Sequence, residues 1–446
     1  MAYLIRGARA IDPQTGLDGT RDVLVEGERI TRVAERIDEV PEGTEAIEGE
    51  GKVLVPGLFD MHVHFRDPGF EYKETIATGS RAAAKGGFTD VATMPNTNPV
   101  CDTGTGVRYQ IDRARAAGLV HLHPVGALTR GEQGEQLSEI GDMVLEGACG
   151  FSDDGHGVQS AGMMRTCMQY VSKFDKPVIA HCEIEDLTAN GVVNEGHAST
   201  RLGMFGWPAL GEELEVWRDI ELCRLTGCPL HIAHISTARG LGYVRAAKAE
   251  GLPVTCEVTP NHLFLTEDDI DDSYDTNLKV NPPLRTKEDA AALREGLVDG
   301  TIDCIVTDHA PHAAHEKDCE FEIAYFGMIG LETSLPLMLT RMVGTGELSW
   351  ERLVDAMAIA PRRVLRLEPA SIAEGSVADL TLIDPERKVK VTPDFIESRS
   401  KNTPWMGAEL EGCATDVLMA GKRTLADGVV AEATPGLEDE RGFMLA

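Results

Sequence analysis

Two histidines near residue 60 have a spacing that suits metal binding. His62 and His64 follow the apolar run 53–59, which is typical of a buried strand. Alternate side chains of a strand share a face, so both imidazoles project the same way and can hold one metal ion. Arg66 continues the alternation, and a fixed cation beside a metal suits an anionic substrate. On these residues alone, two hydrogen-bonded structural histidines explain the spacing equally well.

Further polar side chains stand where other predicted strands end. They are Asn96, Asp153, Asp154, His181, His234 and Asp308. A single histidine at a strand end is usually structural, but several His and Asp residues in this position are hard to explain as packing. With His62 and His64 they are nearly enough ligands for two metal ions bridged by a carboxylate and a water.

The middle of the chain alternates strand-like and helical runs. Strands are predicted at 53–62, 88–93, 120–125, 148–152, 178–181, 230–234, 254–258 and 303–308, with helices between them, among them 75–85 and 212–226. Eight such units predict an α/β fold, a (β/α)8 TIM-like barrel with its chemistry at the carboxyl ends of the strands. An open doubly wound sheet is the competing fold, but no Gly-X-Gly-X-X-Gly sequence follows an early strand.

Both chain ends carry short strands separated by turns. These runs are 4–7, 22–25 and 29–33 at the start, and 378–383, 388–391 and 416–419 near the end. Their likeness predicts one small β-sandwich domain built from both ends. We therefore expect a composite β-sandwich of residues 1–53 and 366–446 beside a barrel of residues 54–365.

Composition limits the class of protein and its partners. The chain has 446 residues, of which 42% are hydrophobic, without a membrane-length apolar run or a signal-peptide pattern, so we expect a cytoplasmic protein. Its 10 cysteines are scattered singly, which favours buried free thiols over a thiolate zinc cluster. The net charge of −31 argues against nucleic acid as a partner and favours a halophilic protein over an ordinary acidic one.

The remaining histidines are predicted to be structural or exposed. His231 lies three residues before His234, so the two face opposite sides of a regular strand, and His309 likewise faces away from Asp308. The others lack a comparable strand-end setting: His121, His123, His156, His197, His262 and His315.

Six segments together resemble the class I dihydroorotases of the amidohydrolase superfamily. The first signature is matched by residues 62–71, His-Val-His-Phe-Arg-Asp-Pro-Gly-Phe-Glu, and the second by 307–312, Thr-Asp-His-Ala-Pro-His. The other matching segments are 94–97, 151–155, 281–285 and 326–333. The resemblance covers nearly the whole chain, and the set of motifs is specific although each one alone is not. The sequence Glu-Ile-Glu-Asp after Cys182 is a small departure from the expected pattern.

The resemblance implies a role for each of these residues. Two zinc ions per subunit would be bridged by Asp154 and a hydroxide, with Asp153 left open as the alternative bridge. His62, His64 and Asp308 would hold one ion, and His181 and His234 the other. Arg66, Asn96 and Asn281 would bind the substrate carboxylate and ring, with His64 beside them, while His312 and the backbone of Phe326 and Gly327 close over it.

The implied reaction is the reversible hydrolysis of the cyclic amide of (S)-dihydroorotate to N-carbamoyl-L-aspartate in pyrimidine biosynthesis. Asp308 would carry the proton between the attacking water and the leaving nitrogen. The alternatives are dihydropyrimidinase, hydantoinase or allantoinase, whose neutral rings give Arg66 no carboxylate, and a non-catalytic scaffold for aspartate carbamoyltransferase. A homodimer and an association with aspartate carbamoyltransferase stay open.

Overall fold

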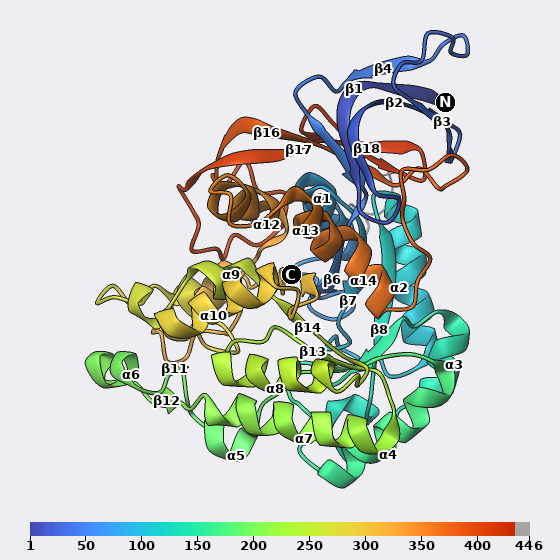
Figure 1. The fold of residues 1–446 in the computed structure, drawn as a ribbon. Coiled ribbons are helices and arrows are strands. Elements are labelled where there is room, and N and C mark those ends of the chain that lie inside the picture. The colour runs from blue at the N-terminus through green and yellow to red at the C-terminus, as the bar shows by residue number, and fades with distance from the viewer. Residues whose placement is uncertain (433–446) are drawn as a thin grey trace, which may run out of the picture.

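A parallel barrel and a sheet made from both chain ends lie one above the other in the computed structural model, which describes residues 1–432 (Figure 1). In this view the blue strands of the N-terminal segment and the red strands of the C-terminal segment lie side by side at the top. The helices α4, α7 and α8 cover the outside of the barrel at the bottom. This arrangement confirms the predicted TIM-like fold with a β-rich unit from both ends.

The barrel sheet runs in the order β15-β14-β13-β10-β9-β8-β7-β6, and every neighbouring pair is parallel. Val63 bridges to His309, and His64 N donates to His309 O at 2.9 Å, so the last strand returns to the first. The strands are β6 (Leu58–Val63), β7 (Phe88–Thr93), β8 (His121–Ala127), β9 (Gly150–Ser152), β10 (Val178–Ala180), β13 (Leu230–Ile232), β14 (Val254–Val258) and β15 (Cys304–Ile305). Closure brings all the carboxyl ends together at one rim.

The longer helices alternate with these strands. They are α1 (Ile76–Gly86), α2 (Gly104–Ala117), α3 (Ile140–Glu146), α4 (Ala161–Val171), α7 (Leu210–Thr226), α8 (Ala238–Ala249), α10 (Lys287–Val298) and α12 (Leu331–Met338). Thr75 caps α1 through a capping box, and Gly87 ends it at φ 98°, a conformation that glycine adopts without strain. The helices predicted at 75–85 and 212–226 are therefore confirmed to within two residues at each end.

Short elements lie in the connections between the longer ones. The helices are α5 (Glu185–Thr188), α6 (His197–Leu202), α9 (Pro260–Phe264), α11 (Ala314–Lys317), α13 (Trp350–Val354) and α14 (Ala360–Val364). A separate two-stranded pair joins β11 (Val193–Asn194) to β12 (Gly206–Trp207). The helix α11 follows the second signature and lies next to the site described below.

The chain-end sheet runs in the order β19-β18-β17-β16-β5-β1-β2-β3, with β4 paired to β1. Its strands are β1 (Ala2–Asp12), β2 (Leu17–Glu26), β3 (Arg29–Ala34), β4 (Glu45–Glu48), β5 (Val53–Pro56), β16 (Leu380–Lys390), β17 (Glu409–Met419), β18 (Lys422–Ala426) and β19 (Val429–Val430). The two halves meet where β5 pairs antiparallel with β16. The domain boundaries at residues 53 and 366 stay predictions, and the last part of the segment 366–446, residues 433–446, lies outside the described residues.

The prediction of one strand over 53–62 is wrong. The chain forms β5 in the chain-end sheet and then β6 in the barrel, and Gly57 lies between them. A side chain at Gly57 would place its Cβ 2.1 Å from Thr89 Oγ1, so only glycine fits where the chain crosses from one sheet to the other. The runs 378–383 and 388–391, predicted as two strands, belong to the single strand β16, whose register shifts between Asp384 and Lys388.

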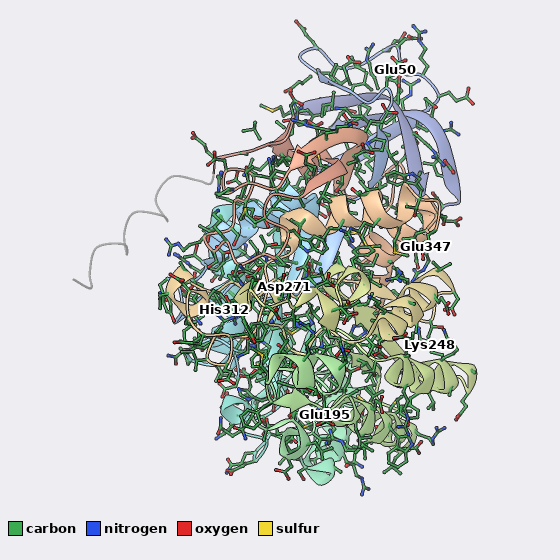
Figure 2. All side chains as sticks on the ribbon, turned by 90° about the vertical axis from the view of Figure 1, so that its left-hand side faces the viewer. Glu50, Glu195, Lys248, Asp271, His312 and Glu347 are labelled. Carbon is green, nitrogen blue, oxygen red and sulfur yellow. The ribbon has the colours of Figure 1, made fainter. Side chains whose placement is uncertain are left out.

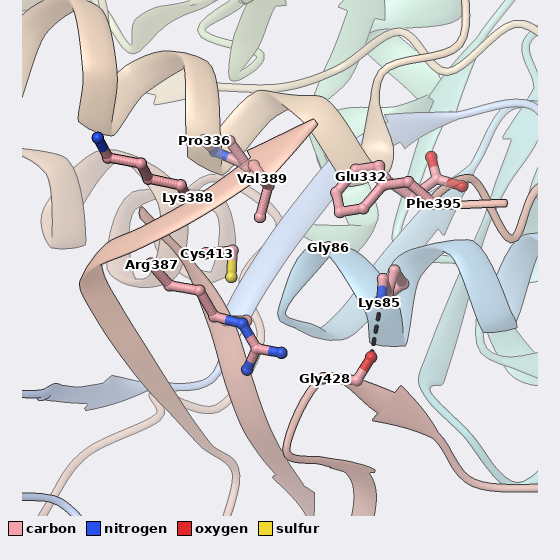
Figure 3. A pocket seen from close by; sticks show the side chains of 11 residues that line it. Lys85, Gly86, Glu332, Pro336, Arg387, Lys388, Val389, Phe395, Cys413 and Gly428 are labelled. Atoms are coloured by element: carbon pink, nitrogen blue, oxygen red, sulfur yellow. Dashed lines mark hydrogen bonds between the residues drawn. The ribbon is translucent and has the colours of Figure 1, made fainter. Parts of the chain in front are cut away.

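A small cavity of about 210 Å³ marks the seam between the barrel and the chain-end sheet (Figure 3). Lys85 Nζ, at the end of α1, donates to Gly428 O at 2.6 Å and lies 5.3 Å from the Phe395 ring centroid. This lysine links the barrel to the last strands of the sheet, far along the chain.

Acidic side chains cover the surface, and the thiols are internal. Glu50, Glu195, Asp271 and Glu347 are all exposed and lie on separate parts of the molecule in Figure 2. None of the ten cysteines is in a disulfide, and eight are buried, which confirms the prediction of free internal thiols. Within residues 1–432, none of the helices combines the length and apolar character that crossing a bilayer requires.

Candidate active site

Six side chains, here called the His/Asp cluster, converge at the carboxyl rim of the barrel: His62, His64, Asp154, His181, His234 and Asp308. All are buried, with exposed fractions between 0% and 8%. His62 lies on β6, and the other five lie within three residues after the end of a barrel strand. His234 and Asp308 have φ angles of 28° and 47°, unusual for residues other than glycine, and this sharp turn ends each strand at the site.

Asp154 is the centre of this cluster. Its Oδ1 lies 3.5 Å from His62 Nε2, 3.6 Å from His181 Nδ1 and 3.8 Å from His234 Nε2. Its Oδ2 lies 3.5 Å from His64 Nε2. Two groups of potential ligands share this carboxylate, one with His62 and His64 and the other with His181 and His234. One carboxylate facing four imidazoles from two sides is an arrangement that can bridge two cations.

Two atoms at the centre lack hydrogen-bond partners. His62 Nε2 and Asp154 Oδ1 are both buried and unpaired. A buried polar atom without a partner costs about 1–3 kcal/mol, so a native site normally supplies one. Imidazole nitrogen and carboxylate oxygen are both ligands of divalent transition metals. The residues present therefore fit a metal centre.

The charges within the cluster favour a bound cation. Burial disfavours the charged form of His181, but the neighbouring carboxylates of Asp154 and Glu183 outweigh it and raise the pKa of His181 to about 10. Burial likewise opposes ionisation of Asp154, yet His62 and the other histidines hold its pKa well below the usual range. The carboxylate is therefore ionised, and its field favours a bound cation.

The geometry separates Asp153 from Asp154. Asp153 Oδ1 accepts hydrogen bonds from Leu128 N at 2.8 Å and Thr129 N at 3.0 Å, and its Oδ2 accepts from the Thr129 hydroxyl. Both of its oxygens are therefore engaged in holding the loop after β8. Asp154 alone of the two points into the cluster.

Asp308 stands at the edge of the cluster that borders the open cavity. Its Oδ1 lies 3.0 Å from His64 Nε2 and 3.7 Å from His62 Nε2. Burial opposes its charge, but hydrogen bonding to His64 and the charge of His62 lower its pKa below the ordinary value. An ionised carboxylate at this position can accept a proton.

A second layer of carboxylates orients the imidazoles. Glu257, on β14 and fully buried, lies 2.6 Å from His62 Nδ1 and 3.0 Å from His231 Nε2. Glu183 Oε2 lies 3.2 Å from His181 Nε2 and accepts a hydrogen bond from Asn281 at 3.1 Å. A carboxylate behind a ligating histidine fixes the ring and raises its basicity. In the sequence, Glu257 could have been noticed as a charged residue inside the predicted strand 254–258.

The cluster forms one wall of a cavity of about 370 Å³. The second wall, here called the arginine side, consists of Arg66, Asn96, Asn281, His312 and the segment Phe326–Gly327. All of these line the cavity, together with His64, Asp154, His181, His234 and Asp308. The structure therefore brings every predicted site residue to one cavity, with His62 directly beneath its floor. Gly155 and Ala310, which lie within the matched segments 151–155 and 307–312, line it as well, and so do His156 and Tyr325, which lie just outside the matched segments.

Contacts within the arginine side hold its polar groups in place. Arg66 has a φ of 60°, and its Nε donates to Pro311 O at 3.3 Å. Asn96 Oδ1 lies 2.9 Å from His64 Nδ1, which leaves its amide nitrogen near Asp154. His312 Nε2 lies 2.7 Å from Phe326 O and 3.5 Å from Arg66 Nη2. A guanidinium flanked by amide and imidazole donors can bind a carboxylate.

The histidines predicted to be structural lie outside the cluster. His231 contacts Glu257 and Thr255, and His309 Nδ1 accepts from Gly330 N at 3.2 Å. His262 contacts Thr259 and the carbonyl of Pro282. His121 and His123 contact aspartates, and His156, His197 and His315 are exposed. Of these, only His156 reaches the cavity.

Comparison with known proteins shows which sequences this chain resembles. A family model described as Dihydro-orotase-like matches residues 51–239. The dihydroorotase of Pelotomaculum thermopropionicum is 46% identical over 430 residues, which cover 96% of this chain and 100% of the relative. The dihydroorotase of Pelobacter propionicus is 48% identical over 422 residues, 95% of this chain and 99% of the relative.

Solved structures of related hydrolases share the fold. L-hydantoinase (dihydropyrimidinase) from Arthrobacter aurescens superposes with a TM-score of 0.87 at 26% identity, over 97% of both chains. D-hydantoinase (dihydropyrimidinase) from a Thermus species gives a TM-score of 0.83 at 26% identity over 96% of both chains. The dihydroorotases are markedly more similar in sequence, and they match end to end. The chain therefore belongs to the dihydroorotase family and has its activity, the hydrolysis of a cyclic amide ring.

Proposed function

We propose that this dihydroorotase works with two zinc ions held by the His/Asp cluster. His62, His64 and Asp308 would hold one ion, His181 and His234 the other, and Asp154 would bridge them. The observation that carries the proposal is Asp154 Oδ1, buried, without a hydrogen bond and within 3.8 Å of three imidazole nitrogens. Four imidazole ligands favour zinc, although manganese or cobalt suits the same set. Two bound metal ions would lower the pKa of a water to about 7 and polarise the ring carbonyl.

We assign the proton transfer to Asp308. The water that attacks the amide carbon must lose a proton, and the ring nitrogen must gain one as the C–N bond breaks. Asp308 lines the cavity beside His64 and is ionised, so one of its oxygens can take the first proton and then deliver it to the nitrogen. The same carboxylate serves the reverse reaction, the closure of N-carbamoyl-L-aspartate to dihydroorotate.

We assign the recognition of the substrate carboxylate to the arginine side. Arg66 can form a forked, charge-assisted pair with it, and Asn96 and Asn281 can add neutral hydrogen bonds. His312 and the Phe326–Gly327 backbone lie where they can close over the ring. Such a pair fixes the ring with its amide carbonyl toward the cluster, and correct orientation is a large part of catalysis. A neutral ring would leave Arg66 without a partner.

The cellular setting is a further proposal. A cytoplasmic location fits a small-molecule substrate, and the net charge of −31 disfavours nucleic acid as a partner. The same charge supports a halophilic source, because salt screens the repulsion between surface carboxylates. A homodimer and an association with aspartate carbamoyltransferase stay predictions for sizing experiments with and without that enzyme.

Metal analysis of the purified protein tests the proposal. Two ions per chain are expected, and a chelator should remove both the metal and the hydrolysis of dihydroorotate. Adding zinc back should restore turnover. Clearly less than one ion per chain, together with activity that survives chelation, would refute the binuclear centre.

A further inference from the structure

Lys73 is a buried lysine that the proposed reaction does not use. It lies in the loop between β6 and α1, and 6% of its surface is exposed. Its Nζ lies 2.9 Å from Glu316 Oε1 on α11 and 4.5 Å from the ring centroid of Tyr325. A buried ammonium is costly unless it is paired, and Glu316 supplies that pair. The ion pair therefore joins the loop of the first signature to the loop of the second.

The same ammonium contacts His312. Lys73 Nζ lies 3.5 Å from His312 Nδ1, and the other ring nitrogen, Nε2, lies 2.7 Å from Phe326 O. A carbonyl oxygen can only accept a hydrogen bond, so Nε2 carries the proton. An ammonium can only donate, so Nδ1 presents its lone pair. Both contacts specify the same neutral tautomer, and the 2.7 Å bond to the Phe326 carbonyl outweighs the longer, 3.5 Å approach of Arg66 Nη2 to the same nitrogen.

Glu316 would favour a different state if Lys73 were absent. Its Oε2 lies 3.5 Å from His312 Nδ1, and a carboxylate there attracts a proton to that nitrogen. Lys73 neutralises this charge and occupies the lone pair. Burial, with the charges of Arg66, Lys73 and Lys317, holds the pKa of His312 well below its usual range. The Tyr325 ring stacks on the imidazole at 5.3 Å between centroids.

We propose that Lys73 is a positioning residue that holds His312 as the neutral Nε2–H tautomer, so that His312 donates to the Phe326 carbonyl and fixes the Phe326–Gly327 segment over the cavity beside Arg66. The inference rests on the proposed role of the arginine side. It assigns Lys73 no contact with the substrate. It also explains why a lysine and a glutamate, distant in sequence, are buried together behind an imidazole.

The first test is the variant Lys73→Met. Glu316 then faces His312 alone, and the neutral ring carries its proton on Nδ1 and turns a lone pair toward the Phe326 carbonyl. The unpaired carbonyl releases the Phe326–Gly327 segment that borders the substrate, so we expect about a 10- to 100-fold rise in KM for dihydroorotate, with a smaller change in kcat. At low pH the ring becomes doubly protonated and regains Nε2–H. KM of the variant should therefore fall toward the wild-type value as pH falls, whereas KM of the wild type stays level.

The double variant Lys73→Met with Glu316→Gln is the rescue. A glutamine side chain is neutral and does not attract a proton to Nδ1 as a carboxylate does, so the Phe326 carbonyl again selects the Nε2–H tautomer. We expect its KM to recover most of the loss and its pH dependence to disappear. Lys85→Met is the matched control, because Lys85 is also a partly buried lysine over an aromatic ring but lies at the seam (Figure 3). This control should lose stability without a change in KM.

Nitrogen-15 NMR spectra of the histidine side chains measure the tautomer of His312 separately from substrate binding. The signal of His312, assigned by its loss in His312→Gln, should report Nε2–H in the wild type and a proton on Nδ1 in Lys73→Met. This measurement needs no substrate, so it stands or falls independently of the proposed function. An unchanged tautomer in Lys73→Met, or a KM equal to that of the wild type at every pH, would overturn the role of Lys73.

Discussion

The two walls of the active-site cavity are held by different kinds of structure. The His/Asp cluster lies on or just after barrel strands, and carboxylates on β14 and just after β10 fix its imidazoles. The arginine side lies on loops, and contacts between distant loops position it, such as Lys73 with Glu316. The first wall is thus as rigid as the barrel, while the second depends on a few polar contacts. Damage to the first should affect metal binding and turnover, and damage to the second should affect substrate binding and choice.

The largest effect is expected for Asp308→Asn. The amide cannot take up and return a proton, so turnover should fall about 100- to 10,000-fold while at least one metal ion stays bound. Parallel metal analysis and steady-state kinetics on dihydroorotate check this prediction. Asp303→Asn is the matched control, because Asp303 lies before the same strand at the opposite end of the barrel and pairs with Lys248. Near-normal turnover in metal-loaded Asp308→Asn would contradict the assignment.

Glu257→Gln probes how the first wall is supported. Glu257 contacts His62 from behind, and loss of such a partner typically weakens metal binding about 10- to 100-fold. Competition with a chelator of known affinity measures the change. At saturating metal, KM for dihydroorotate should be close to that of the wild type. Unchanged metal affinity together with a raised KM would show that Glu257 acts on substrate binding, and it would contradict the separate roles of the two walls.

Arg66→Lys probes the second wall. Lysine keeps the charge but loses the fork, so kcat/KM for dihydroorotate should fall about 10- to 100-fold. The value for dihydrouracil, which lacks the carboxylate, should change much less. The metal content should be that of the wild type. Equal losses on both rings would show that Arg66 supports the His/Asp cluster and does not read the carboxylate.

The smallest effect concerns the surface that surrounds both walls. With a net charge of −31, the protein should gain a few degrees in Tm, and also activity, between low salt and molar KCl, since molar salt shortens the screening length to about 3 Å. Melting curves over a KCl series test this. Sodium and potassium chloride should act alike, because screening depends on ionic strength. A Tm that stays constant across the series would argue against a halophilic protein.

The first wall was largely predictable from the sequence, for a physical reason. Alternation along a strand places His62 and His64 on one face, and a parallel barrel brings all carboxyl strand ends together. What could not be predicted depends on tertiary contacts. Asp153 and Asp154 have equivalent positions in the sequence, and only the hydrogen bonds from Leu128 and Thr129 distinguish them.

The second wall and the join between the sheets were less predictable. The motifs gave Arg66 and His312, but no local pattern links Lys73 to Glu316, because the two lie on loops that follow different strands. The division at Gly57 was missed because residues 53–62 read as one apolar strand, and the change of sheet depends on the close approach of Thr89. Local periodicity predicts elements well, whereas packing between elements decides where they turn.

The most direct test of the whole account is the kcat/KM of the metal-loaded wild type on dihydroorotate and on dihydrouracil. Both rings offer the same cyclic amide to the His/Asp cluster, and they differ mainly in the carboxylate that the arginine side would bind. We predict a preference for dihydroorotate of several powers of ten, because the paired carboxylate both binds and orients the ring. Comparable values for the two rings would contradict the account and would show that the arginine side does not select the substrate.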